Sequence, residues 1–134
     1  MLPKFDNYFD LDTDTEIFLS YKKMPLCVFY TNVPGTNVPK DFEVELCKVL
    51  AEVLSKPIEK VTVNVFTDQR MVRGGSSEPT CWMNLWSINV FSAENNPLYA
   101  SKLYPFISEA LGIKNDKIVL LFHDIKAEQL GKPS

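Results

Sequence analysis

The stretch "EVLSKPIEKVTVNVF", residues 52–66, occurs a second time in altered form as "EALGIKNDKIVLLFH", residues 109–123. The two segments align without a gap at an offset of 57 residues. Identical or similar residues stand at matching positions: Glu52 with Glu109, Leu54 with Leu111, Lys60 with Lys117, Val61 with Ile118, and Asn32-Val33 with Asn89-Val90. This register predicts that the chain contains two copies of one structural unit.

Apolar residues ahead of each segment follow a helical spacing in the same register. Both sets recur at i, i+4, i+7 and i+8, which is the pattern of one buried face of an α-helix. The first set is Phe42, Leu46, Val49, Leu50, Val53 and Leu54, and the second is Tyr99, Leu103, Phe106, Ile107, Ala110 and Leu111. Since chance could produce either stripe alone, their shared register indicates an internal duplication.

Each half of the chain is therefore predicted to form a strand, a helix and a second strand. In the first half we expect strands over 26–31 and 61–66 around a helix from about 39 to 55. In the second half we expect strands over 80–90 and 117–124 around a helix from about 97 to 111, with Asn96 as its cap and a kink at Pro105. A strand–helix–strand connection gives a parallel, right-handed unit. The predicted fold class is α+β, in which duplicated β-α-β units form a four-stranded mixed sheet with both helices on one face.

The sheet face that the two helices leave uncovered is predicted to be apolar. Val119 and Leu121 fall on the alternate side of the last strand, and Trp82 and Trp86 share one side of the third. A solvated sheet face should alternate to polar residues, and an apolar one usually means that another subunit covers it. We therefore expect a closed homo-oligomer. The alternative is that the N-terminal segment of the same chain covers this face.

Residues 1–23 differ in composition from the rest of the chain. Acidic residues in this stretch are separated by aromatic residues and leucines: Asp6, Asp10, Asp12, Asp14 and Glu16. It lacks the basic start and continuous apolar core of a secretory signal. No window of the chain approaches the roughly 18 apolar residues of a membrane span. We expect an acidic, flexible N-terminal extension over 1–23 and one domain over 24–134.

Composition narrows the classes of function. A chain of 134 residues is one domain by length, and its net charge of −3 offers no basic surface for nucleic acid or an anionic membrane. Cys27, Cys47 and Cys81 are scattered and odd in number, and His123 is the single histidine. Neither a disulfide framework nor a zinc site is predicted from that set. We expect no metal, no cofactor, no nucleic-acid partner and no membrane insertion.

Several separated motifs resemble the macrophage migration inhibitory factor family. They are "MPLCVFYTNVP" (24–34), "KP" (56–57), "DQRMVRGGSSEP" (68–79) and "SINVFSAENN" (87–96). Residues 42–65 and "LGK" at 130–132 are similar to its D-dopachrome tautomerase branch. The resemblance runs from Pro25 to the C-terminus and implies a homotrimer. It also implies a cofactor-independent keto–enol tautomerase of phenylpyruvate-like or dopachrome-like substrates, often with an extracellular signalling role.

The resemblance assigns the role of catalytic base to Pro25, because in that family the proline after the initiator methionine becomes the chain terminus. Proton removal next to a carbonyl needs a base with a pKa near the working pH. An α-amino group starts at about 7.7 to 8.0, and burial or a neighbouring cation lowers its pKa. While Pro25 is joined to Met24, however, its nitrogen is an amide and cannot act as a base. Initiation at Met24, or removal of residues 1–23, would allow methionine trimming to expose it, whereas Leu2 after Met1 is too bulky for that trimming.

The resemblance also assigns residues to a substrate pocket. Lys56 would bind the substrate carboxylate or the developing enolate oxygen, and Ile88 would contribute its backbone N–H, with Ser87 beside it. Val119 and Leu121 stand where the family has hydrogen-bonding side chains that come from a neighbouring subunit. Because both are apolar, we expect a more apolar pocket and weaker dopachrome activity.

Other candidates have simpler interpretations. Leu130 and Lys132 are the remaining candidates for pocket contact in a short C-terminal tail. Lys56 has the alternative interpretation of a solvated lysine at a helix C-terminus, stabilised by the helix dipole. His123 is interpreted as a structural or surface residue. Residues 73–79 are interpreted as a turn, since no helix follows them as a phosphate loop requires.

Two hypotheses of function follow from these assignments. The first is a tautomerase that uses Pro25 as its base on a small aromatic keto acid. The second is a catalytically inactive homotrimer that signals through its surface to a cell-surface receptor. No signal peptide is evident, so under either hypothesis we expect the protein in the cytoplasm, or outside the cell after leaderless export.

Overall fold

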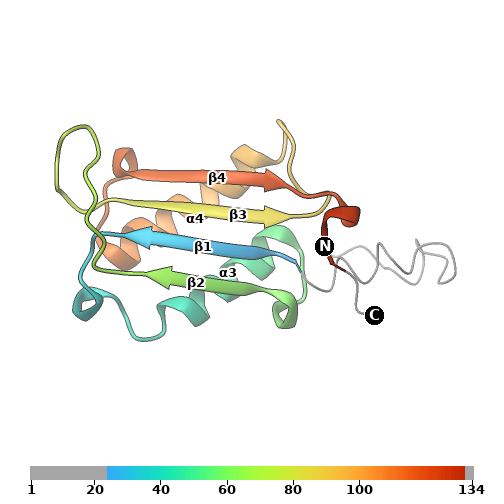
Figure 1. Ribbon diagram of the computed structural model, residues 1–134, viewed down its shortest axis with the longest axis horizontal. Helices are drawn as coiled ribbons and strands as arrows, with labels where there is room; N and C mark the ends of the chain where they lie inside the picture. Colours follow the sequence, from blue (N-terminus) through green and yellow to red (C-terminus); the bar gives the residue numbers. More distant parts are fainter. Residues whose placement is uncertain (1–23, 132–134) are drawn as a thin grey trace, which may run out of the picture.

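The computed structural model describes residues 24–131, which form one four-stranded sheet backed by two helices (Figure 1). The strands are β1 (Leu26–Thr31), β2 (Thr62–Phe66), β3 (Cys81–Ser87) and β4 (Ile118–Asp124), in the spatial order β2-β1-β3-β4. β1 runs parallel to β2 and β3 runs parallel to β4, while β1 and β3 are antiparallel. Helices α3 (Phe42–Leu54) and α4 (Asn96–Leu111) both lie behind the sheet. The predicted fold is confirmed; the extension over 1–23 and Lys132 fall outside the described residues.

The duplication is visible in the backbone, at the offset seen in the sequence. α3 ends in Ser55 with φ 54°, and α4 ends in Gly112 with φ 67°, both in the left-handed conformation. A 3-10 turn follows each helix, η2 (Ile58–Lys60) and η3 (Asn115–Lys117), and leads directly into β2 or β4. The two halves therefore share a helix end, a turn and a strand start, and not merely the same order of elements.

The core lies between the sheet and the helices. The predicted helical stripes are confirmed: each stripe residue is either buried or packed against the core. Buried stripe residues are Phe42, Leu46, Leu50 and Leu54 of α3, with Leu103, Ile107 and Leu111 of α4. From β1, the ring of Phe29 packs edge-on against that of Phe42, with ring centroids 5.3 Å apart. Burial of these apolar faces, rather than helix propensity alone, holds the two helices against the sheet.

The start of α3 and the end of β3 each differ from the prediction by about three residues, and each difference has a local cause. α3 begins at Phe42 because residues 39–41 form a turn, closed by a hydrogen bond of 3.0 Å from the Phe42 N–H to the Pro39 carbonyl. β3 ends at Ser87 rather than at 90 because Asn89 adopts φ 57°, which is incompatible with an extended strand.

The start of α4 also differs from the prediction. The N-cap position is held by Asn95, and Asn96 is the first helical residue. The prediction that Asn96 caps this helix is wrong, because its Oδ1 accepts the N–H of Ser92 at 3.1 Å in the loop before the helix. Pro105 lies inside α4, which continues to Leu111.

The uncovered face of the sheet carries an aromatic row at one end. The ring of Tyr30 stacks on Phe66 at 5.1 Å and on Trp82 at 5.2 Å between centroids. Phe66 and Trp82 are about 40% exposed (42% and 39%), as is Leu121 (40%). Asn84 interrupts this apolar surface in the middle of β3, so the predicted apolar character holds for part of the face. Coverage by another subunit remains a prediction. In the described residues, no helix is long and apolar enough to cross a membrane.

Candidate active site at one end of the sheet

Pro25 lies at the end of the sheet where β1 begins and β3 ends. Leu26 pairs with Trp86 in the antiparallel ladder, so Pro25 and Ser87 stand one residue further on, on adjoining strands. The carbonyl of Pro25 accepts the N–H of Thr62, the first residue of β2, at 3.1 Å. Since side chains alternate along a strand and Cys27 is in the core, Pro25 lies on the helix-covered side of the sheet. Pro25 itself is buried.

Lys56 lies at the same end, in the connection from α3 to β2. Its backbone N–H donates to the carbonyl of Ala51 at 2.9 Å, which closes the helix end. The residue is only 4% exposed. The alternative that it is a solvated helix-terminal lysine is therefore wrong.

The duplication shows what the fold itself requires at the position of Lys56. Its counterpart in the second half is Ile113, which is 1% exposed. The same backbone thus closes around an apolar side chain just as well, and apolar residues are the usual occupants of such positions. A buried amine at residue 56 is consequently an addition that folding does not explain.

Burial changes the acid–base behaviour of Lys56. Loss of hydration disfavours the charged amine and lowers the pKa of Lys56 from 10.5 to about 8. At pH 7 the side chain therefore remains mostly protonated, and it presents a cation in a region of low dielectric. A cation in such a place interacts strongly with an anion that displaces the remaining water.

Ser87 and Ile88 complete this end of the sheet, and both are buried, at 0% and 1% exposure. Within residues 24–131, the Ser87 Oγ finds no hydrogen-bond partner. At the other end of the sheet, the buried hydroxyl of Thr31 donates to the Thr80 carbonyl at 2.8 Å. An unsatisfied buried hydroxyl costs about 1–3 kcal/mol, so its retention favours a role in binding.

The remaining predicted pocket residues lie elsewhere on this chain. Val119 pairs with Trp82 and Leu121 pairs with Asn84, so both side chains lie on the uncovered face of the sheet. The structure thus brings together Pro25, Lys56, Ser87 and Ile88, and it separates Val119 and Leu121 from them. In the tail, Leu130 is half-buried and follows the 3-10 turn η4 (Ala127–Gln129).

His123 is held within the uncovered face of the sheet, which supports its structural interpretation. Its Nε2 lies 2.9 Å from Oδ1 of Asn84, and its ring stacks on Trp86 with centroids 4.8 Å apart. Cys27, Cys47 and Cys81 are free thiols. In the described part of the chain, no group of three or more His, Cys, Asp or Glu side chains could hold a metal ion.

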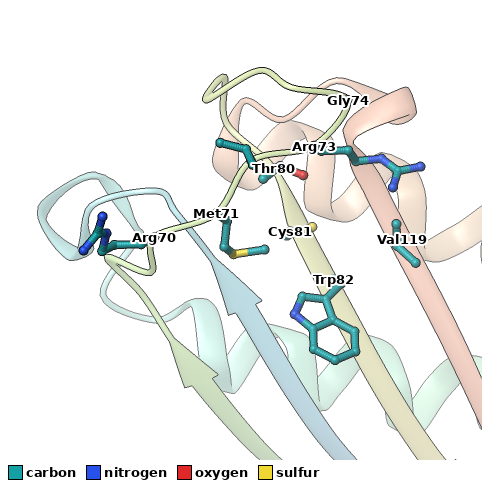
Figure 2. Close-up of a pocket in the computed structure, with 9 residues that line it drawn as sticks. Arg70, Met71, Arg73, Gly74, Thr80, Cys81, Trp82 and Val119 are labelled. Atoms are coloured by element: carbon teal, nitrogen blue, oxygen red, sulfur yellow. The ribbon is translucent and has the colours of Figure 1, made fainter.

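A second concave region was missed in the sequence. It is an open hollow of about 590 Å³ at the opposite end of the sheet from Pro25, where β1 ends and β3 begins. Arg70, Arg73, Trp82 and Val119 are among its lining residues (Figure 2). The available signal was the pair of arginines three residues apart in "RMVR", the only arginines in the chain.

Fold and site together define an α+β protein of duplicated β-α-β units, with a proline, a buried lysine and a buried serine hydroxyl at one sheet end. Residues 24–134 match the family model described as Macrophage migration inhibitory factor (MIF). The chain belongs to the macrophage migration inhibitory factor family.

Individual relatives agree with this assignment. The chain is 39% identical over 110 residues to the D-dopachrome decarboxylase of Xenopus tropicalis, and this match covers 81% of this chain and 93% of the relative. It is 34% identical over 108 residues to the MIF-like protein mif-2 of Caenorhabditis elegans, over 81% of this chain and 90% of the relative. Among solved structures it is similar to the macrophage migration inhibitory factor of Trichinella spiralis, with a TM-score of 0.77, 29% identity and coverage of 80% and 95%. A homologue from Prochlorococcus marinus gives a TM-score of 0.73 at 28% identity, with coverage of 81% and 95%.

Proposed function

We propose that the protein is a cofactor-independent keto–enol tautomerase of small aromatic keto acids, phenylpyruvate-like or dopachrome-like, in any form that begins at Pro25. The family match and the relatives named D-dopachrome decarboxylase and macrophage migration inhibitory factor support a tautomerase-like or cytokine-like function in general. The observation that carries the finer proposal is the buried amine of Lys56 at the same sheet end as Pro25.

The proposed reaction uses one base and one cation. As a chain terminus, Pro25 has a secondary amine that takes a proton from the carbon next to the substrate carbonyl, and the electron pair moves toward the carbonyl oxygen. Water protonates that oxygen to give the enol, and the protonated proline releases its proton to water, so the reaction is a net isomerisation and the base is regenerated. Lys56 stabilises the developing negative charge or the substrate carboxylate. The Ser87 hydroxyl and the backbone N–H of Ile88 supply further donors at the same end of the sheet.

The proposal includes assembly as a homotrimer. Val119 and Leu121 lie too far from Pro25 on one chain to line the same pocket, so they would reach it only from a neighbouring copy. The MIF fold is oligomeric in this family, which is consistent with self-association. We further propose that the protein acts in the cytoplasm, or outside the cell after leaderless export.

A second function, as a catalytically inactive signalling protein with a cell-surface receptor, is favoured by a different observation. Met24 is only 2% exposed and is joined to Pro25, so the proline nitrogen is an amide in the chain as given. Val119 and Leu121 also lack the polar groups that would hydrogen-bond a substrate. Both features would be tolerated in a protein that keeps the fold and works through its surface.

Enolisation of phenylpyruvate separates the two functions. We expect turnover by protein that begins at Pro25, a loss of at least about 100-fold in Pro25→Gly, in the range of a lost acid–base catalyst, and no turnover by the full chain. Mass analysis of the N-terminus of the natural protein shows which form exists. Full activity in a chain with an intact Met24–Pro25 bond would overturn the mechanism. Absence of turnover in the Pro25-ended form would favour the signalling function.

A further inference from the structure

Met24 is buried at the end of the sheet that holds Pro25. Only 2% of this residue is exposed, although it lies outside β1. The antiparallel register pairs Leu26 with Trp86, and continuing that register by two residues brings Met24 opposite Ile88. Ile88 is 1% exposed. Two apolar side chains are therefore enclosed just beyond the last pair of the ladder, at the candidate active site.

The burial of Met24 is separate from that of the main core. The core cluster between the sheet and the helices includes Cys27 and Phe29 of β1, but within the described chain neither Met24 nor Ile88 belongs to it. Side chains alternate along an extended chain, so Met24 lies on the side of the sheet opposite to Cys27. Packing of the helices on the sheet therefore does not account for the burial of Met24.

Met24 begins at the very atom that would act as the base. Its carbonyl carbon is bonded to the Pro25 nitrogen at about 1.33 Å, and its Cα lies one bond further away. A substrate carbon that gives up its proton must approach the same nitrogen to within roughly 3 Å. Met24 and a substrate therefore compete for one space. Because Met24 is 2% exposed, it is not turned away from that space into solvent.

The residues assigned to the pocket walls suit a methionine side chain. Methionine is unbranched and flexible, and it fills irregular apolar gaps. Ile88 offers an apolar surface beside it, and in the proposed homotrimer Val119 and Leu121 of a neighbouring copy would offer two more. The residues that lack polar groups for a substrate are thus well matched to a thioether chain.

We propose that Met24 occupies the substrate pocket of its own chain, so that the full chain is a latent form whose pocket is closed to small aromatic acids. The full chain then lacks more than a basic nitrogen, because binding of the ligand is prevented as well. Hydrolysis of the Met24–Pro25 bond by one water leaves a carboxylate on Met24 and an amine on Pro25, and it vacates the pocket in the same step. The inference rests on the proposed function, since it takes the pocket at Pro25 and Lys56 as the substrate site.

Ligand-observed NMR titration with 3-phenylpropanoate tests the proposal. This probe has the ring and carboxylate of phenylpyruvate but no ketone, so it reports binding without enolisation. We expect the Pro25-ended protein to bind it at least about 10-fold more tightly than the full chain, because apparent affinity falls with the fraction of molecules whose pocket is open. Met24→Gly in the full chain keeps the amide and removes the side chain, and it should bind with intermediate affinity. Lys56→Met in the Pro25-ended protein should weaken binding about 10-fold, since it removes a charge-assisted contact with the carboxylate.

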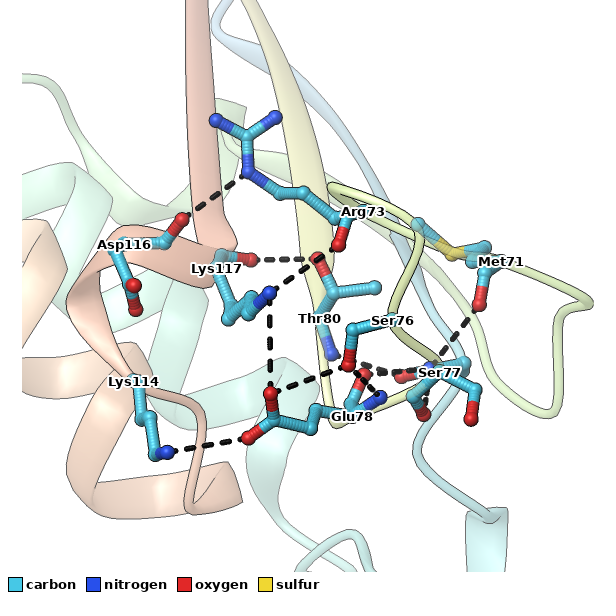
Figure 3. A network of polar contacts seen from close by, with 10 residues as sticks. Met71, Arg73, Ser76, Ser77, Glu78, Thr80, Lys114, Asp116 and Lys117 are labelled. Atoms are coloured by element: carbon cyan, nitrogen blue, oxygen red, sulfur yellow. Dashed lines mark hydrogen bonds and ion pairs between the residues drawn. The ribbon is translucent and has the colours of Figure 1, made fainter.

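Met71→Ala in the full chain is the matched control. Met71 lies in the loop at the opposite end of the sheet, where its backbone carbonyl accepts the side-chain amide of Asn32 at 3.4 Å (Figure 3). Its side chain can therefore be shortened without loss of that bond, and the variant should bind the probe as weakly as the full chain does. Met24→Ala guards against a backbone effect of glycine in Met24→Gly and should also bind with intermediate affinity.

The outcomes separate this inference from the proposed function. The inference is overturned if the full chain binds the probe as tightly as the Pro25-ended protein, even where the Pro25-ended protein turns over phenylpyruvate. It is also overturned if Met24→Gly and Met24→Ala both bind as weakly as the full chain while the Pro25-ended protein binds, because the side chain of Met24 is then not the obstacle. Failure of every form to bind the probe would contradict the proposed pocket itself, and the latent form with it.

Discussion

The backbone N–H of Thr62 donates a hydrogen bond to the carbonyl oxygen of Pro25 over 3.1 Å. This bond joins the first residue of β2 to the residue that precedes β1. Lys56 lies in the connection that leads into β2, and its own N–H donates to the carbonyl of Ala51 at the end of α3 over 2.9 Å. Backbone hydrogen bonds therefore hold both the proposed base and the proposed cation at one end of the sheet.

Replacement of Lys56 by methionine should stabilise the protein. Burial lowers the pKa of Lys56 to about 8, so whatever contacts the amine makes, the fold disfavours its charged form at pH 7 relative to water. Ile113 shows that the same position of the fold accepts an apolar side chain. We expect Lys56→Met to raise the free energy of unfolding at pH 7 by about 1–3 kcal/mol, as measured by urea denaturation. Lys102→Met on the surface of α4 is the control for the loss of one positive charge. A less stable Lys56→Met variant at pH 7 would show that the amine is well compensated in the fold.

The same substitution should have a pH-dependent effect. The pKa of Lys56 falls from 10.5 to about 8 in the fold, so between these values the unfolded chain binds more protons than the folded one. The stability of the wild type should therefore rise relative to Lys56→Met as the pH increases from about 8 to 10.5. Denaturation curves at pH 7 and pH 10 measure this difference, and a constant gap would contradict it.

Ser87→Ala should separate stability from substrate binding. Removal of a buried hydroxyl without a partner relieves a desolvation cost, so we expect an unfolding free energy unchanged or higher by up to about 1 kcal/mol. If the hydroxyl contacts substrate, KM for phenylpyruvate should rise in the Pro25-ended protein. Thr31→Val is the matched control, because the Thr31 hydroxyl is hydrogen-bonded to the Thr80 carbonyl and its loss should destabilise the fold. Equal destabilisation by both substitutions would count against a binding role for Ser87.

The two helix ends provide opposite substitutions at equivalent positions. Ser55 and Gly112 both have a left-handed backbone, which costs about 1–2 kcal/mol in a residue with a Cβ. Gly112→Ala should lower the free energy of unfolding by about 1 kcal/mol. A Cβ at this position meets no atom within 4 Å, so the cost lies in the backbone conformation. Ser55→Gly should raise the free energy of unfolding by up to about 1 kcal/mol. Thermal unfolding of both variants measures the pair, and effects of the same sign would contradict the argument.

Leu121→Lys should weaken assembly. Leu121 is 40% exposed on the uncovered face of the sheet, and a charge buried there against another subunit would be strongly unfavourable. We expect the mass in light scattering to fall from a trimer toward a monomer. Val44→Lys, at a position that is 56% exposed on α3, is the control and should leave the mass unchanged. A monomeric wild type would contradict the predicted homotrimer directly.

The fold could be predicted from the sequence because the duplication presents every periodic signal twice. Boundaries were less predictable, since they depend on single backbone conformations such as the positive φ of Asn89 and the turn that Pro39 closes. Because two asparagines, Asn95 and Asn96, are adjacent in the sequence, the pattern could not decide which of them caps α4. Periodicity reports which face of an element is buried, but it does not report where the element stops.

The candidate site was partly predictable. The resemblance identified Pro25, Lys56, Ser87 and Ile88, and strand order then brings the ends of β1 and β3 together. The burial of Lys56 and the lack of a partner for Ser87 depend on packing in three dimensions, which no local pattern records. The hollow beside Arg73 was missed for the same reason, because a loop, β3 and β4 form it jointly.

The correspondence between Lys56 and Ile113 is useful for engineering, because the two halves of the chain share a backbone at matched positions. A residue found at a position in one half should therefore be accepted at the matched position of the other half more readily than an arbitrary residue. Ile113→Lys would test whether a buried amine can be accommodated at the opposite end of the sheet. In evolutionary terms, duplication would have let one half acquire chemistry while its twin preserved the architecture.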